Sequence, residues 1–259
     1  RGGVLFFGGF MTQQPPMSRV IGPWHEWMNR WPTPDDLAEE DSGEAVAAWG
    51  RLGYPRRALR LHSCAVAIAT EHDGVVPNSY DELVALPGIG DYTASAVVSF
   101  AFGGRATVLD TNVRRLIARA ESGIANCPTS VTRAERVVAD ALVPDEDARA
   151  AKWAVASMEL GALVCTARSP QCEVCPIRDS CRWVIDGRPD NAPARRGQPW
   201  KGTDRQCRGV IMDVVRNSPH GVKVQMALSA WPQPDQASRC LESLLDDGLV
   251  HRRGNLISL

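Results

Sequence analysis

Residues 165–181 read CTARSPQCEVCPIRDSC, with four cysteines in the order C-x6-C-x2-C-x5-C. So many cysteines in so short a stretch indicate either a metal site or the disulfides of a secreted scaffold. A structural zinc usually takes two C-x2-C pairs or a mixture of Cys and His, but there is one such pair here and no histidine between Ala162 and Arg216. Four thiolates are also the ligands of a [4Fe–4S] cluster, although this spacing differs from both ferredoxin patterns. The segment favours an iron–sulfur cluster held by Cys165, Cys172, Cys175 and Cys181.

The composition is that of an ordinary globular protein. The chain has 259 residues, of which 44% are hydrophobic and 23% charged, with a net charge of −1. One or two domains are expected, and disorder is not. Only three of the 29 basic residues are lysines; the arginines cluster, which suits phosphate binding but is also common on a solvated helix face. Both interpretations stay open for the clusters Arg51, Arg56, Arg57 and Arg60; Arg114, Arg115 and Arg119; and Arg195, Arg196, Lys201, Arg205 and Arg208.

The sequence indicates a protein of the cytoplasm with no membrane association. No stretch approaches the roughly 18 apolar residues of a membrane span, and the Gln-Gln-Pro-Pro after the apolar segment 4–11 is a poor signal-peptide cleavage site. The chain begins at Arg1 rather than Met, and we expect that its natural N-terminus is missing. In a reducing cytosol, scattered cysteines are small buried hydrophobes, as we expect of Cys64, Cys127, Cys207 and Cys240.

Most of the chain is predicted to be helical. Residues 186–204 are rich in Pro, Gly, Asn and Arg and are interpreted as a linker. Beyond them, helices near 205–216, 222–231 and 235–247, the stop at Gly248 and a terminal hairpin predict a winged-helix-like module. Before the linker, apolar residues recur at helical intervals, with Pro and Gly at the breaks, in 44–50, 56–70, 94–102, 113–120, 133–142 and 150–164.

A second motif, Leu86-Pro87-Gly88-Ile89-Gly90, lies between a helix ending near Ala85 and one starting near Asp91. Two glycines within three residues permit a tight turn whose backbone N–H groups can approach an anion, and the next helix N-terminus adds a partial positive charge. A phosphodiester would fit there, whereas most Pro-Gly-x-Gly sequences are simply turns.

Three features, in this order along the chain, resemble the endonuclease III superfamily of base-excision DNA glycosylases. They are this helix-hairpin-helix, Asp110 in Val108-Leu109-Asp110-Thr111-Asn112-Val113, and the four cysteines. Within this superfamily, the chain is similar to the MutY-type adenine DNA glycosylases in four segments: Gln13-Gln14 after Met11, Gly53-Tyr54, LPGIGDYTA and MELGALVCTARSPQCEVCP. The resemblance covers about residues 4–185.

The resemblance implies a mainly α, two-lobed fold. A six-helix barrel lobe with the helix-hairpin-helix (83–104) would span 1–108 and a cluster lobe 109–185, followed by the linker and the module 205–259. It further implies a [4Fe–4S] cluster, a monovalent cation at the hairpin, and contact with DNA by Gly88, Ile89 and Gly90. The substrate would be double-stranded DNA with A:8-oxoguanine or A:G mispairs, bound by a nucleoid-associated monomer.

Asp110 is the candidate catalytic carboxylate. A glycosylase takes the base out of the duplex and stabilises the positive charge that develops on the sugar. An Asp at a helix start could do this, although helix capping alone is the commoner role of such a residue. By resemblance, Asn112 would help to hold the sugar and phosphate, and Glu159 would lie at the base pocket.

Tyr92 distinguishes between two reaction types. Bifunctional relatives carry at this place a Lys that forms a Schiff base, which requires a primary amine. The lysines of this chain are Lys152, Lys201 and Lys223, none in the hairpin. A monofunctional glycosylase is therefore expected, although Tyr92 could also be an ordinary packing residue.

The N-terminal segment departs from the family. Where the resemblance implies E-x-M-x-Q-Q-T, whose Glu protonates the adenine, the chain reads Gly9-Phe10-Met11-Thr12-Gln13-Gln14-Pro15. General acid catalysis typically contributes about 10²–10⁴-fold, so the sequence predicts a slow or inactive enzyme. Either the segment contains a sequence error or the protein is a degenerate homologue.

Further contacts follow from the resemblance. Gln13 or Gln14, and Tyr54, would be wedges entering the base stack, although a polar pair before Pro15-Pro16 could equally be a helix end. Arg168 would meet a phosphate. The third helix of the module carries acidic residues, which favours packing over base recognition. Two alternatives to an adenine glycosylase remain: a non-catalytic DNA-binding homologue, and a thymine or uracil mismatch glycosylase, against which the Gln pair argues.

Overall fold

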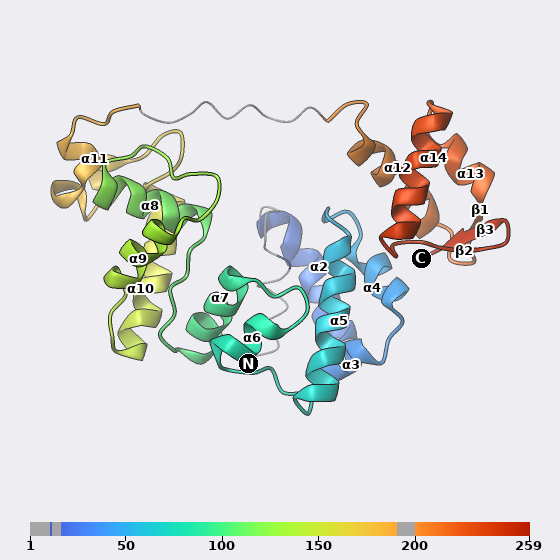
Figure 1. The fold of residues 1–259 in the computed structure, drawn as a ribbon, viewed down its shortest axis with the longest axis horizontal. Coiled ribbons are helices and arrows are strands. Elements are labelled where there is room, and N and C mark those ends of the chain that lie inside the picture. Colours follow the sequence, from blue (N-terminus) through green and yellow to red (C-terminus); the bar gives the residue numbers. More distant parts are fainter. Residues whose placement is uncertain (1–10, 12–16, 191–199) are drawn as a thin grey trace. The chain divides into compact units, whose positions relative to one another are not determined.

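The computed structural model describes residue 11 and residues 17–190 and 200–259, and the chain forms two compact units (Figure 1). Of these residues, the first unit takes Asn78–Ala85 and 89–190. The second unit takes 11, 17–77, Leu86–Gly88 and 200–259. The described part of the chain is mainly helical, as predicted, and contains no helix that is both long and apolar enough to cross a membrane.

The second unit begins with four helices around a tryptophan core. The rings of Trp31 and Trp49 both meet Trp27 edge to face, with centroids 4.8 and 5.8 Å away, and all three are buried. A capping box between Thr33 and Asp36 starts the second of these helices. The helices are α2 (Met17–Arg30), α3 (Pro34–Ala38), α4 (Ser42–Trp49) and α5 (Arg56–Glu71).

The first unit packs its helices around Leu109, Val113, Ile117 and Ala139. Its helices are α6 (Tyr80–Ala85), α7 (Asp91–Phe102), α8 (Thr111–Ser122), α9 (Arg133–Leu142) and α10 (Asp147–Glu159). A π-helical turn η1 (Leu160–Val164), the short turns η2 (Cys172–Val174) and η3 (Arg178–Ser180), and α11 (Arg182–Ile185) complete it.

The last part of the second unit contains the predicted three helices and hairpin. The hairpin turns at Gly254 (φ +61°), and Gly248 (φ +67°) follows the last helix. A short strand, β1, pairs with the β3 strand of this hairpin, which gives a sheet in the order β1-β3-β2 with Val222 opposite Ile257. The elements are α12 (Asp204–Arg216), β1 (Val222–Lys223), α13 (Val224–Ser229), α14 (Pro234–Asp246), β2 (His251–Arg253) and β3 (Leu256–Ser258).

Two predicted helices differ from the structure. The helix predicted over 150–164 ends at Glu159 and continues as the π-helical turn, which directs the chain toward Cys165. The helix predicted over 222–231 begins two residues later, because Val222 and Lys223 form a strand. Helix α2 was not predicted, since Pro23 lies inside it.

Candidate functional site

The turn between α6 and α7 leaves backbone open to solvent. Gly88 has φ +76°, a conformation that suits glycine. Ile89 anchors the turn by burying its side chain, and Gly90 is the N-cap of α7. A Cβ on Gly90 would meet no atom within 4 Å. The N-terminal amides of a three-turn helix are therefore accessible to an anion.

Asp91 connects this turn to two other helices. Its carboxylate accepts hydrogen bonds from both terminal nitrogens of Arg136 on α9 at 2.6 and 2.9 Å. The Tyr80 hydroxyl at the start of α6 donates to it at 2.7 Å. Burial raises the pKa of the Asp91 carboxyl, but the hydrogen bonds from Arg136 and Tyr80 outweigh it, so that the pKa is lowered. The ionised carboxylate thus holds α6, α7 and α9 together.

Asp110 caps α8 with one oxygen and holds Asn112 with the other. The Val113 backbone N–H donates to Oδ1 at 2.7 Å, and the Asn112 side-chain amide donates to Oδ2 at 2.8 Å. The capping role and a fixed carboxylate therefore coexist in one residue, which is half-buried at the start of the helix.

Tyr92 lies in the first turn of α7 and packs against a small cluster that includes Ala96, Val108 and Ala154. Burial, and after it the negative charge of Asp110, raise the pKa of its phenol. The Tyr92 hydroxyl therefore lies close enough to Asp110 for the carboxylate charge to affect its pKa. The packing contacts of Tyr92 also agree with an ordinary structural role.

Arg115 joins Asn112 to the start of the cysteine segment. Its Nη2 donates to the Asn112 side-chain oxygen at 2.9 Å, and its Nε donates to the Cys165 carbonyl at 2.7 Å. Nη2 also donates to the Gly161 carbonyl at 2.5 Å. A Cβ on Gly161 would come within 2.6 Å of the Asn112 carbonyl oxygen, so the π-helical turn can lie this close to Asn112 only because a glycine is there.

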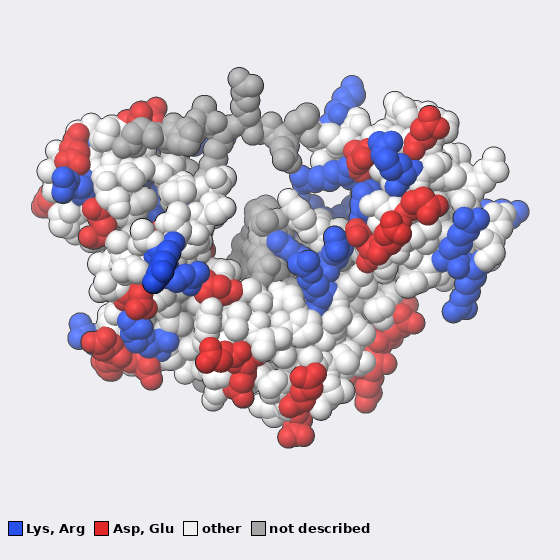
Figure 2. All heavy atoms as spheres, in the orientation of Figure 1, with Lys and Arg blue, Asp and Glu red and all other residues white. Residues whose placement is uncertain are grey.

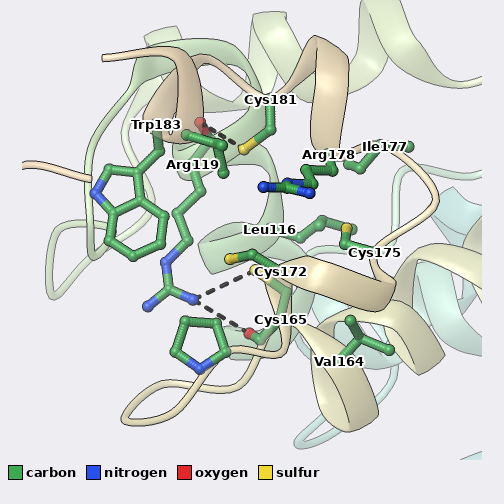
Figure 3. A pocket seen from close by; sticks show the side chains of 12 residues that line it. Leu116, Arg119, Val164, Cys165, Cys172, Cys175, Ile177, Arg178, Cys181 and Trp183 are labelled. Carbon is green, nitrogen blue, oxygen red and sulfur yellow. Dashed lines mark hydrogen bonds between the residues drawn. The ribbon is translucent and has the colours of Figure 1, made fainter. Parts of the chain in front are cut away.

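The four predicted ligands line one pocket (Figure 3), and none forms a disulfide. Burial, together with the neighbouring cysteines, raises the pKa of Cys175. Among the described residues no three Cys, His, Asp or Glu side chains are placed to hold a single metal ion. Four cysteine side chains around one pocket suit a [4Fe–4S] cluster, which takes four Cys thiolates as ligands. The cluster would hold the loop that its ligands Cys165, Cys172, Cys175 and Cys181 belong to.

Arg119 fixes this loop to α8. Its Nη1 donates to the Cys165 Sγ at 3.3 Å and to the Thr166 carbonyl at 2.8 Å. Its guanidinium lies 4.6 Å from the ring centroid of Trp183, which is also buried (Figure 3). The pocket is therefore lined by a cation that faces the ligand sulfur.

The cluster Arg114, Arg115 and Arg119 is neither a solvated face nor a phosphate site, since these side chains are 7%, 6% and 2% exposed. Arg114 forms a two-point ion pair with Glu135, at 2.5 and 2.9 Å. These internal roles could not be predicted from the sequence, because a helical run of arginines does not reveal which backbone carbonyls lie opposite. The predicted burial of Cys64, Cys127, Cys207 and Cys240 is confirmed.

The remaining predicted residues lie at the surface or outside the described residues. Tyr54 is 49% exposed with φ +50°. Glu159, the last residue of α10, and Arg168, between the first two cysteines, are also exposed. Gly9, Gln13, Gln14, Arg195 and Arg196 lie outside the described residues.

Comparison with known sequences agrees with the site. Residues 7–139 match the HhH-GPD superfamily base excision DNA repair proteins, and residues 165–181 match the iron-sulfur binding domain of endonuclease III. The adenine DNA glycosylase of Mycolicibacterium smegmatis is 50% identical over 94% of this chain and 82% of its own length. The Mycobacterium tuberculosis enzyme of the same name is 47% identical over 94% and 80%.

Solved structures agree on the fold. A thermostable thymine-DNA glycosylase aligns with a TM-score of 0.63 at 23% identity, covering 71% of this chain and 85% of that one. Endonuclease III in a non-covalent DNA complex aligns with a TM-score of 0.61 at 26% identity, covering 71% and 84%. The resemblance inferred from the cysteines, the hairpin and Asp110 is thus confirmed, and the chain belongs to the HhH-GPD superfamily of base-excision DNA repair proteins and, within it, to the adenine DNA glycosylases.

Proposed function

We propose that this protein is a monofunctional DNA glycosylase that removes adenine mispaired with 8-oxoguanine or guanine. The observation that carries the proposal is the Asp110 carboxylate, held by the Val113 amide and Asn112 on the helix that is joined to the cysteine loop. The relatives named adenine DNA glycosylase, at 47–50% identity, support the choice of adenine. We propose that the protein works at the nucleoid, where its DNA substrate lies, and that it is a monomer.

The proposed chemistry requires charge at a fixed place. As the bond between base and sugar breaks, positive charge develops on the sugar, and a preorganised carboxylate stabilises it more than water does. Because Asp110 cannot rotate without losing hydrogen bonds to Val113 and Asn112, its orientation is set before the substrate binds. The turn at Gly88–Gly90 supplies backbone amides to a phosphate, with a monovalent cation proposed at the same turn.

The proposed reaction stops at hydrolysis, because strand cleavage through a Schiff base needs an amine. Tyr92 stands at the place of the lysine and is partly buried beside Ala96 and Val108. We expect no covalent adduct when borohydride is added to the protein with adenine-containing or abasic duplexes. Efficient trapping would contradict the monofunctional assignment.

The second candidate function is a DNA-binding homologue with little catalysis. One observation favours it: Gly9 stands where the family pattern has the general acid. Such a protein would use the same turn and cysteine segment to bind DNA, and adenine would leave slowly because protonation of the base is missing.

Single-turnover release of adenine from an A:8-oxoguanine duplex tests the first function. The parent should release adenine faster than the Asp110→Asn variant by about 10²-fold or more, since the carboxylate is proposed to act in the transition state. Equal rates for both proteins, with tight and selective binding of a duplex containing an abasic analogue opposite 8-oxoguanine, would establish the second function instead. Thymine or uracil release without adenine release would overturn both.

A further inference from the structure

The C-terminal module is attached by charged contacts to the segment before α5 and to the first residue of α5. Arg51 forms an ion pair with Asp213 of α12 at 2.8 Å, and Arg56 pairs with Asp247 after α14 at 3.4 Å. Asp247 is further neutralised by Arg208 at 2.6 Å. Two acidic groups of the module are thus occupied by arginines, and the repulsion of DNA expected from this acidic end of α14 is reduced at Asp247.

Between these ion pairs the segment presents Tyr54. The chain turns sharply there, with φ +86° at Gly53 and +50° at Tyr54, so a non-glycine residue holds a backbone conformation that favours glycine. Strain of this kind persists where surrounding contacts fix it and is common at ligand sites. The Tyr54 side chain is nevertheless 49% exposed; packing alone does not explain its placement.

Cations and aromatic rings alternate at this place. The guanidinium carbons of Arg57 and Arg205 lie 5.2 and 5.4 Å from the ring centroid of Tyr54. Arg205 lies 5.0 Å from the ring centroid of Trp200 as well. Arg205 therefore connects the two rings, one from each part of the second unit, and Trp200 is 52% exposed.

The surface formed by Tyr54, Trp200 and Arg205 has the chemistry of a nucleic-acid contact. Exposed aromatic rings stack on bases that have lost a neighbour, and guanidinium groups bind phosphate and stack on rings. The contacts of Arg205 with the Tyr54 and Trp200 rings leave its positive charge available to a phosphate. Basic side chains gather at the start of α5, and basic and acidic side chains lie together over α12 (Figure 2).

We propose that Trp200, just before the C-terminal module, and Arg205 of the module form, with Tyr54, one surface that binds the DNA strand at the mispair. The inference rests on the proposed function, because it takes DNA as the ligand. Arg205 positions the Tyr54 ring through the cation–π contact and binds a phosphate, while Trp200 stacks on a base left without its partner. The module thus acts as a DNA-binding element without placing a helix in the major groove.

The test is the affinity for a duplex that carries a tetrahydrofuran abasic site opposite 8-oxoguanine, compared with an undamaged duplex. Arg205→Gln and Trp200→Ala should each weaken binding of the damaged duplex by about 10-fold, as stacking on one aromatic side chain typically contributes. Arg205→Lys keeps the charge but loses the planar stack, so it should recover only part of the affinity. Arg253→Gln, which removes one exposed charge from strand β2 of the same module, is the matched control.

Each outcome decides between the inference and its alternatives. If Arg205→Gln and Trp200→Ala bind as tightly as the parent, with unchanged melting temperatures, the surface does not contact DNA and the inference is wrong. If both variants lose no more affinity than Arg253→Gln does, on the damaged and the undamaged duplex alike, only non-specific charge contributes to binding and the inference is wrong. If the parent protein binds the damaged and the undamaged duplex equally well, the proposed function itself is refuted. That result concerns the parent and is distinct from the effect of the variants, which tests the inference alone.

Discussion

Arg115 donates from Nε to the carbonyl oxygen of Cys165 at 2.7 Å, so that the first cysteine of the metal loop is attached to the helix that Asp110 caps. The same guanidinium donates to Asn112, which in turn donates to Asp110. One buried side chain therefore lies between the metal centre and the proposed catalytic carboxylate. A change in the loop would be transmitted to Asp110 through three hydrogen bonds.

Replacing Arg115 by Met should reduce the rate of adenine release by about 10-fold or more, because Asn112 would lose the partner that orients it. The rate is measured in single-turnover assays on the fraction that contains iron. Arg114→Met is the matched control: it removes a buried guanidinium from the same helix without touching Asn112. Breaking its ion pair with Glu135 should cost about 3–5 kcal/mol of stability while the folded enzyme keeps its rate. Equal rates for both variants would contradict the connection.

Protein purified without oxygen should be yellow-brown and contain about four irons per chain, because four cysteines line one pocket. Cys172→Ser should lower the iron content and weaken DNA binding, since the loop carrying Arg168 would lose its support. Metal analysis and absorption spectra provide the measurement. One zinc per chain and no iron would rule out the cluster.

The ionised form of Asp91 should stabilise the first unit above about pH 4. Hydrogen bonds from Arg136 and Tyr80 lower its pKa in the folded protein, so its contribution is present above the unfolded pKa and is lost as pH falls through the folded value. The melting temperature of Asp91→Asn should therefore be lower than that of the parent near pH 6, and the difference should shrink toward pH 3. A difference that stayed constant over this range would mean that the charge of Asp91 is unimportant.

Gly90→Asp should weaken binding to every duplex, damaged or not, because it adds a negative charge and a side chain at the turn where a phosphate is expected. A Cβ at Gly90 meets no neighbouring atom, so the variant should fold normally. Gly22→Asp is the control, since Gly22 is an exposed helical glycine that is also without close neighbours. Binding by Gly90→Asp at low salt as tight as that of the control would show that the turn is structural only.

Features formed by neighbouring residues could be predicted from the sequence, whereas contacts between distant parts of the chain could not. The cysteine spacing, the N-cap Asp110 and the turn at Gly88 are each contained in a few consecutive residues, and local rules interpret them correctly. Arg115 and Arg119 bind carbonyl groups that lie 46–50 residues away along the chain. Nothing near them in the sequence distinguishes a buried arginine from a solvated one, so only the fold reveals their role.

Gly9 occupies the position of the general acid in the family pattern. The sequence has Met11, Gln13 and Gln14 in family register, but no carboxyl group before Glu26 that could protonate adenine. Adenine is a poor leaving group unless it is protonated, and a general acid typically contributes about 10²–10⁴-fold. The rate of the parent should therefore be limited at this step.

Gly9→Glu should increase adenine release from an A:8-oxoguanine duplex by about 10²-fold or more, because a carboxyl group can then donate the proton that the base needs. Gly9→Gln has a similar size but no proton to donate at neutral pH, so it should leave the rate near that of the parent. Adding Asp110→Asn to Gly9→Glu should remove the gain, since a protonated base leaves slowly if the sugar cation is not stabilised. Single-turnover kinetics on the four proteins measure all these rates. A parent as fast as Gly9→Glu would show that another group supplies the proton, and the role assigned to this position would be wrong.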